Sequence, residues 1–251
     1  MNQCFQAGLV SVSFRDHSPE EILVAMQQAR LTCIEWGSDV HAPCADGKAL
    51  DKLVSLQKKY GITCCSYGTY FRLGVTPLEE LPGYIRAAKT LGTDILRLWC
   101  GNQNSEDYTQ EEKQALFSAC RAAAELAKEE NVTLCLECHN NTYTNGAQAA
   151  LEVMQAVASP RFRMYWQPNQ RRTEEENLAY ATLLAPYTRH LHVFNWKGKE
   201  RFPLAQALGL WQKYLNCFPG DRTLLLEFMP DNDIATLPGE ATALHELIHT
   251  V

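Results

Sequence analysis

Four polar residues stand at or near the ends of four successive apolar segments in the second half of the chain. Glu137 closes VTLCLE, Gln167 closes FRMYWQ, His192 lies in RHLHVF, and Glu227 follows TLLL. Carboxylate oxygens, an imidazole nitrogen and an amide oxygen are all ligands that divalent cations bind in proteins. If the four segments are strands that end at one edge of a sheet, the sequence predicts a metal site there.

Strand-like and helix-like segments alternate along the whole chain, which favours a parallel sheet. Three helix starts carry the capping-box pattern, a Ser or Thr followed three residues later by Glu, at Ser18, Thr109 and Thr173. Gly61 and Gly92 have the position of glycines that end a helix. The predicted strands cover residues 8–13, 31–36, 61–67, 94–99, 132–137, 162–167, 189–194 and 222–228.

Eight strand–helix units in 251 residues predict an α/β fold, a single-domain (β/α)8 TIM barrel over residues 1–251. The sequence has no GxGxxG motif after the first strand and no P-loop, so the usual signals for an open sheet are missing. No linker or low-complexity tract divides the chain. In such barrels the catalytic residues lie at the C-terminal ends of the strands.

Side chains alternate across a strand, so Glu137 shares a face with Cys135, and His192 shares a face with His190. On the inward face at the barrel rim, Glu137, His192 and Glu227 would meet around the axis. Two carboxylates and an imidazole so placed need a cation or protons to offset their repulsion and lost hydration. Ordinary loop-facing polar residues are the alternative interpretation of each residue taken singly.

The segments IEWGSDVHAP, KTLGTDILRLWCG, LCLECHNNT, YWQPN, HLHVFNW and LLLEF resemble the sugar phosphate isomerase/epimerase family, the xylose isomerase-like TIM barrels that include the ketose 3-epimerases. The resemblance covers nearly the whole chain in order. It implies that Glu137, Gln167, His192 and Glu227 bind a divalent metal (Mn²⁺, Mg²⁺ or Zn²⁺), with Glu137 and Glu227 also acting as catalytic acid and base. Gln167 stands where the family has Asp, so its amide oxygen brings no charge and metal affinity should be lower.

Further residues near the predicted strand ends are candidates for binding substrate. They are His41, Trp99, His139, Asn169, Trp196, Lys197 and Arg201. Tryptophan rings often stack on sugars, while Lys197 and Arg201 could hold an anionic group. The additional acid and histidine that the resemblance implies near the substrate are not evident, since Tyr143 and Gln170 occupy about those places. Glu35 and Arg97 lie in mid-strand and predict an interior ion pair.

Composition narrows the classes of partner. A net charge of −6 argues against binding a nucleic-acid backbone, and no run of eighteen apolar residues suggests a membrane span. The N-terminus lacks the pattern of a signal peptide, and several of the ten cysteines lie within predicted strands, so we expect a cytoplasmic, reduced protein. Barrels of this kind often associate, so a homo-oligomer is compatible with the sequence.

Two short motifs have a less specific meaning. His245-Glu246-Leu247-Ile248-His249 matches HExxH, but the chain gives no third zinc ligand downstream, and a last helix would pack outside the barrel. Cys135 and Cys138 form a CxxC pattern, yet residues three apart in a strand point to opposite faces, so the two thiols should not meet.

The sequence therefore predicts a metal-dependent isomerase or epimerase of a small sugar or sugar derivative, which transfers a proton beside a carbonyl through a metal-stabilised enediolate. A lyase or dehydratase acting on a keto-sugar with the same site is one alternative. A non-catalytic carbohydrate-binding barrel is another, motivated by Gln167. Repair of abasic DNA by a related endonuclease is disfavoured by the acidic charge and by the shortage of further metal ligands.

Overall fold

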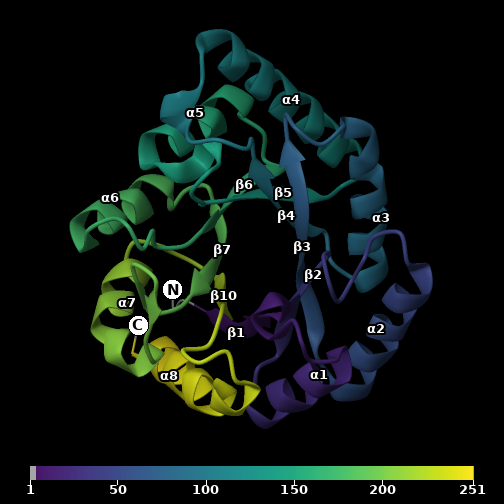
Figure 1. Ribbon diagram of the computed structural model, residues 1–251, viewed down its shortest axis with the longest axis vertical. Coiled ribbons are helices and arrows are strands. Elements are labelled where there is room, and N and C mark those ends of the chain that lie inside the picture. The colour runs from purple at the N-terminus through teal and green to yellow at the C-terminus, as the bar shows by residue number, and fades with distance from the viewer. Residues whose placement is uncertain (1–3, 251) are drawn as a thin grey trace.

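Eight parallel strands close into a barrel, and the helices form a ring around it (Figure 1). The computed structural model describes residues 4–250. In barrel order the strands are β1 (Phe5–Val10), β10 (Arg222–Leu226), β7 (Thr188–Val193), β6 (Phe162–Trp166), β5 (Thr133–Glu137), β4 (Ile95–Cys100), β3 (Thr63–Leu73) and β2 (Cys33–Gly37). This arrangement is a (β/α)8 TIM barrel, so the predicted fold class is confirmed.

The helices are α1 (Pro19–Gln28), α2 (Gly47–Tyr60), α3 (Leu81–Leu91), α4 (Gln110–Glu129), α5 (Ala147–Val157), α6 (Glu174–Leu184), α7 (Leu208–Leu215) and α8 (Leu237–His249). Ser18, Thr109 and Thr173 each form the predicted capping box at the start of a helix. Gly61 and Gly92 end α2 and α3 with φ of +66° and +86°, the left-handed region that favours glycine.

Two strand predictions need correction at their boundaries. The first strand ends at Val10, and Ser11–Phe14 form a 3₁₀ turn, in which Ser11 Oγ accepts a hydrogen bond from the Gly37 N–H at 2.9 Å. The third strand runs on to Leu73 through an irregular register with β4, well beyond the predicted residue 67. A short antiparallel hairpin of β8 (Trp196–Lys197) and β9 (Glu200–Arg201) was not predicted.

Two apolar clusters result from the alternation of side chains along the strands. The larger lies between the barrel and the helices, and it includes Trp36 and Trp166. The smaller fills the barrel interior with Val10, Cys33, Cys135, Tyr165 and Leu225 among its members. Residues on the same strand faces nearer the rim are therefore directed into the barrel.

Among residues 4–250, no helix combines the length and apolar character needed to cross a membrane.

Candidate active site

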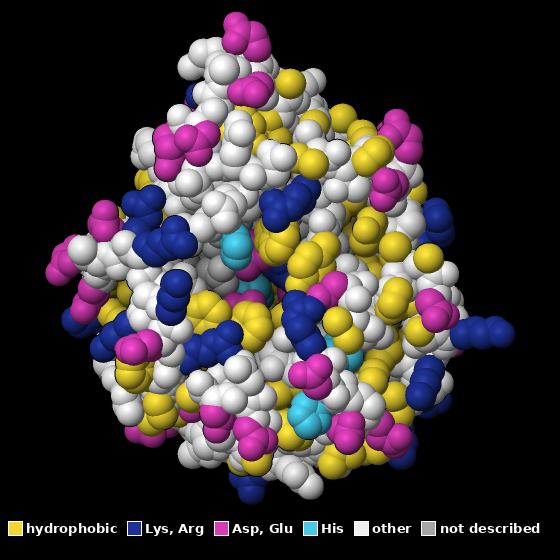
Figure 2. All heavy atoms as spheres, in the orientation of Figure 1, with side chains coloured by type: hydrophobic (Ala, Val, Ile, Leu, Met, Phe, Trp, Pro, Cys, Tyr) yellow, Lys and Arg dark blue, Asp and Glu magenta, His cyan; other side chains and the backbone are white. Residues whose placement is uncertain are grey.

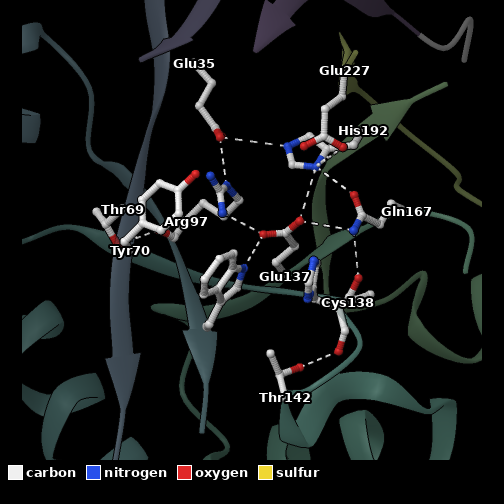
Figure 3. Close-up of polar contacts among 12 residues, drawn as sticks. Glu35, Thr69, Tyr70, Arg97, Glu137, Cys138, Thr142, Gln167, His192 and Glu227 are labelled. Atoms are coloured by element: carbon white, nitrogen blue, oxygen red, sulfur yellow. Dashed lines mark hydrogen bonds and ion pairs between the residues drawn. The ribbon is translucent and has the colours of Figure 1, made fainter. Parts of the chain in front are cut away.

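The four predicted metal ligands come from four neighbouring strands. Glu137 is the last residue of β5, Gln167 directly follows β6, His192 lies in β7, and Glu227 directly follows β10. All four side chains are at least nine-tenths buried. Because parallel strands end at the same rim, their side chains point toward one another, as Figure 3 shows.

The ring atom His192 Nδ1 is the centre of this group. It lies 2.9 Å from Gln167 Oε1, 3.4 Å from Glu227 Oε2 and 3.7 Å from Glu137 Oε1. Gln167 Nε2 donates to Glu137 Oε1 at 3.1 Å and to the Cys138 carbonyl at 3.0 Å. Glu137, His192 and Glu227 each offer a ligand atom, and these atoms lie within 4.8 Å of one another. Within the described part of the chain, this is the one group of three or more His, Cys, Asp or Glu residues that is so close together.

The second oxygen of Glu137 is held from the opposite side. Arg97 Nη1 donates to Glu137 Oε2 at 2.6 Å, and the Trp99 indole N–H donates to the same oxygen at 2.5 Å. Both donors lie on the inward face of β4, two residues apart. Arg97 also donates to Glu35 at 2.8 Å, which confirms the predicted interior ion pair. The contact of this pair with Glu137 was not predicted from the sequence, although the strand alternation that places residues 97 and 99 on one face is a signal for it.

The two glutamates have opposite electrostatic environments. Burial alone would raise the pKa of Glu137, but Arg97 and nearby histidines outweigh it and lower that pKa to about 2. Burial and the adjacent Glu137 carboxylate raise the pKa of Glu227 well above its ordinary value. Burial lowers the pKa of His192. In the absence of a cation, Glu137 is therefore ionised, Glu227 favours its protonated form and His192 is neutral.

These residues fit a divalent cation. Ligands about 2.1 Å from a metal ion are separated by ~3.0–3.5 Å when adjacent. The 3.4 Å from His192 Nδ1 to Glu227 Oε2 falls within this range, and the 3.7 Å to Glu137 Oε1 exceeds it slightly, so a small movement of Glu137 would complete a shared site. Three buried carboxylates (Glu35, Glu137, Glu227) and the buried Arg97 guanidinium sum to −2 when all are ionised. A divalent cation would offset that charge, which is costly in a buried site.

A cavity of about 270 Å³ opens onto these ligands. Five predicted substrate-binding or catalytic residues line it together with Gln167 and Gln170, namely Glu137, Glu227, His139, Asn169 and Trp196. Asn169 is fixed by a hydrogen bond from its amide to Asn140 at 2.9 Å. The Trp99 ring stacks on His139 with centroids 5.2 Å apart, so Trp99 reaches the site through Glu137 and His139.

Three residues considered from the sequence lie less directly at this cavity. His41 is buried, and its two ring nitrogens lie 3.1 Å from Ser11 Oγ and 3.1 Å from the His17 carbonyl. Lys197 is exposed and lines a neighbouring cavity of about 400 Å³. Tyr143 is buried against the helices and donates to Glu152 at 2.8 Å, so it offers the cavity no hydroxyl in this arrangement. Substrate binding by His41 and Lys197 stays a prediction.

Cationic side chains surround the entrance. Figure 2 shows Lys and Arg side chains gathered around a central hollow in which acidic and histidine side chains are visible. The Arg201 guanidinium lies 4.5 Å from the Trp196 ring centroid and 4.7 Å from that of Phe228, and both rings line the cavity. Arg72 lies 4.2 Å from the Trp99 ring centroid. Within residues 4–250, neither arginine forms an ion pair with a carboxylate.

The HExxH motif lies outside the barrel and the two CxxC thiols do not meet, as the sequence predicts. His245 and His249 lie on α8, and His245 Nε2 lies 3.3 Å from the Ala29 carbonyl, outside the barrel. Cys135 belongs to the interior cluster, while Cys138 packs in the cluster between barrel and helices. The thiols of this pair therefore lie on opposite sides of the strand.

Comparison with known proteins assigns the family. The family model described as "Xylose isomerase-like TIM barrel" matches residues 24–220 of this chain. The chain belongs to the xylose isomerase-like TIM barrel family. This confirms the resemblance stated from the motifs.

One curated relative and two solved structures illustrate the range within this fold. A 3-dehydroshikimate dehydratase of Bacillus anthracis is 31% identical over 72 residues, which is 29% of this chain and only 26% of the relative's length. The structure of the probable 3-DHS dehydratase AsbF of Bacillus anthracis superposes with a TM-score of 0.80 at 18% identity, covering 96% of this chain and 98% of that one. A D-psicose 3-epimerase of Clostridium cellulolyticum H10 gives 0.71 at 13% identity, with 97% and 98% covered.

Two further structures of this fold were determined with metal ions. A xylose isomerase-like TIM barrel protein of Mycobacterium smegmatis, in complex with magnesium, has a TM-score of 0.67 at 12% identity, covering 99% of this chain and 97% of that one. The IOLI protein, with a bound zinc atom, has 0.76 at 13% identity, with 98% of each chain covered. At these identities the likeness establishes the fold alone, and the metal ions of the two structures are not thereby assigned to this chain.

Proposed function

We propose that this protein is a metal-dependent isomerase or epimerase of a small sugar or sugar derivative, which moves a proton on a carbon beside a carbonyl. The observation that carries the proposal is the convergence of two buried carboxylates, an imidazole and an amide on one rim, facing a cavity large enough for a small polyol. Membership of the xylose isomerase-like family supports an activity on sugar-like substrates.

Glu137 Oε1, Gln167 Oε1, His192 Nδ1 and Glu227 Oε2 would hold the cation, Mn²⁺, Mg²⁺ or Zn²⁺. When bound, such an ion supplies Lewis acidity that polarises a carbonyl and acidifies the neighbouring C–H bond. Gln167 contributes an oxygen without charge, so the site depends on the two glutamates for its attraction to the ion. This arrangement suits moderate affinity for the metal.

Glu137 and Glu227 suit the proton transfer because their environments differ. Arg97 and Trp99 bind Oε2 of Glu137 and favour its ionised form, so the carboxylate would accept the proton from carbon at Oε1, the oxygen that would also hold the cation. Glu227 lies across the site from Glu137 at the same cavity and is proposed to return a proton to carbon from the other side. The C–H electron pair passes to the carbonyl oxygen in the first step and returns to carbon in the second. In the reverse reaction the two roles exchange.

The cavity walls provide contacts for a hydroxylated substrate. His139, Asn169 and Gln170 offer hydrogen-bonding groups, and Trp196 offers an aromatic face. Arg201 lies over the outer part of that wall and is proposed to hold an anionic group of the substrate. Lys197, at the neighbouring cavity, is proposed as a secondary contact for the same kind of group.

Dehydration is the second candidate reaction. If one glutamate removes the same proton and the other protonates a hydroxyl group on the next carbon, that group leaves as water and a carbon–carbon double bond forms. The specific observation in its favour is the likeness to a 3-dehydroshikimate dehydratase, both in a short matching segment and in the superposed fold.

Metal binding and product analysis test the proposal in sequence. Chelator-stripped protein should bind about one equivalent of Mn²⁺ in titration calorimetry, and His192→Ala should abolish that binding. Loaded protein should then be incubated with ketoses and with 3-dehydroshikimate, and the products identified by NMR. An epimeric or isomeric product supports the first reaction, and loss of water supports the second.

The matched control is His245→Ala, which removes a histidine on the outer helix α8 and should leave Mn²⁺ binding unchanged. Mn²⁺ binding that survives His192→Ala would show that the ion does not bind at the barrel rim. Ligand binding without turnover, insensitive to chelator, would instead favour a non-catalytic carbohydrate-binding barrel.

A further inference from the structure

A buried chain of charged groups runs from the far side of the barrel to the proposed metal ligands. Glu35 on β2 accepts from Arg97 Nε at 2.8 Å, and Arg97 Nη1 donates to Glu137 Oε2 at 2.6 Å. Glu35 is fully buried and Arg97 is 3% exposed. Figure 3 shows the Arg97 guanidinium between the two carboxylates, with His192 beside Glu35.

The backbone leaves room for this chain at one specific residue. Gly68 lies on β3, between the strands that carry Glu35 and Arg97. A Cβ atom at position 68 would collide with Glu35 Oε1 and lie 2.8 Å from Arg97 Nη2. The glycine therefore permits the carboxylate and the guanidinium to meet across β3 inside the barrel.

His192 presents one ring nitrogen to each end of this chain of charges. Nδ1 faces Gln167, Glu137 and Glu227 at 2.9–3.7 Å, while Nε2 lies 3.9 Å from Glu35 Oε1. Within the described residues, His192 Nε2 and Glu35 Oε2 are both buried without a hydrogen-bond partner. Buried polar atoms that lack partners are costly, and the Glu35 carboxylate lies beside His192 Nε2 through Oε1, so a state of the site that pairs them would remove this cost.

Binding of a cation by Nδ1 would create that state. A ligating nitrogen carries no proton, so the neutral ring must hold its proton on Nε2. The buried carboxylate of Glu35 is the acceptor placed beside Nε2. A histidine ligand that donates its other N–H to a carboxylate is a recurrent arrangement in metal sites, because the carboxylate fixes the ring orientation and raises its basicity.

We propose that Glu35 and Arg97 are positioning residues for the metal site, an inference that rests on the proposed metal-binding function. Glu35 accepts the Nε2 proton of His192 when Nδ1 binds the ion. Arg97 binds Glu137 Oε2, so Glu137 offers the ion only Oε1. Glu35 also neutralises the charge of the buried Arg97 guanidinium, which would otherwise repel the ion.

Metal affinity in matched variants tests the inference. Glu35→Gln keeps the size of the side chain but removes its charge, and it should weaken Mn²⁺ binding by about 10–100-fold in titration calorimetry on stripped, folded protein. Glu35→Asp retains a carboxylate and should restore part of the affinity. Glu240→Gln is the control, because Glu240 is also buried but lies on α8, where it accepts from the Leu204 N–H.

A second measurement reads the proton directly. In Zn²⁺-loaded wild-type protein, ¹⁵N NMR of the histidine rings should show His192 bound through Nδ1 and protonated at Nε2. Its Nε2 resonance should shift in Glu35→Gln and not in Glu240→Gln. If Glu35→Gln does not fold, the wild-type spectrum alone decides, since a ring bound through Nε2 would overturn the inference.

The outcomes separate this inference from the proposed function. Wild-type protein that binds no Mn²⁺ would contradict the metal site and the inference with it. Wild-type binding with an unchanged dissociation constant in Glu35→Gln would overturn only the inference. A lower melting temperature in Glu35→Gln without weaker Mn²⁺ binding would show that the pair has a purely structural role.

Discussion

Replacing the uncharged ligand tests the electrostatic description of the site most sharply. In Gln167→Glu the new carboxylate oxygen would replace Nε2, which now donates to Glu137 Oε1 at 3.1 Å and to the Cys138 carbonyl at 3.0 Å. Two favourable contacts would become contacts between oxygen atoms. The metal-free protein should therefore lose stability, and a bound cation should restore it.

The size of the effect follows from two competing costs. Two unit charges 3.1 Å apart repel by ~5 kcal/mol at an effective dielectric constant of about 20. Protonating a carboxyl group with an ordinary pKa of about 4.3 costs ~3.7 kcal/mol at pH 7 and ~1 kcal/mol at pH 5. Protonation is the cheaper route, so the loss of stability should approach ~3.7 kcal/mol at pH 7 and shrink toward ~1 kcal/mol at pH 5.

Denaturant unfolding of chelator-treated protein at pH 5, 6 and 7 measures this loss. Gln170→Glu is the control, because Gln170 lines the same cavity but its side chain makes no hydrogen bond to Glu137. Saturating Mn²⁺ should stabilise Gln167→Glu more than wild type. Equal metal-free stability of Gln167→Glu and wild type at pH 7, with equal stabilisation by Mn²⁺, would refute the reasoning.

Three further predictions follow from the same contacts. Burial and Glu137 raise the pKa of Glu227, so its ionisation lowers the stability of the folded protein as pH rises through that pKa. In urea unfolding of metal-free protein, Glu227→Gln should therefore be more stable than wild type at pH 8, and the difference should shrink toward pH 5. In calorimetry, Arg201→Gln should weaken the binding of D-ribulose 5-phosphate about tenfold or more, because it removes a charge-assisted hydrogen bond of ~1.5 kcal/mol to the phosphate. The affinity for D-ribulose, which has no phosphate, should not change. Gly68→Ala should lower the free energy of unfolding by roughly 1–3 kcal/mol and weaken Mn²⁺ binding, because its Cβ would displace the Glu35–Arg97 pair; unchanged values for both would contradict the steric argument.

The fold was predictable because local signals agreed along the chain. Capping boxes at Ser18, Thr109 and Thr173 and the C-terminal glycines marked the helices between apolar runs. The hairpin of β8 and β9 was missed because each of its strands has two residues, too short for any periodic pattern. The extension of β3 to Leu73 was missed because its irregular pairing interrupts the alternation.

The convergence of the four proposed ligands was predictable, and the contacts around them were less so. Strand ends place Glu137, Gln167, His192 and Glu227 on one rim, which strand periodicity can indicate. Which contacts a side chain makes depends on neighbours across the barrel, and spacing alone does not specify them. Trp99 illustrates this limit, since its indole N–H binds Glu137 where a stacking role toward substrate was expected.

Deuterium exchange tests the central claim, proton transfer at carbon by the rim glutamates, most directly. Mn²⁺-loaded protein would be incubated in D₂O with D-fructose, D-ribulose, D-ribulose 5-phosphate and 3-dehydroshikimate, and deuterium beside the carbonyl measured by NMR. The account predicts incorporation into at least one of these compounds that disappears after chelation and in Glu137→Gln. Incorporation that persists in Glu137→Gln, or its absence from every compound with the metal bound, would contradict the account.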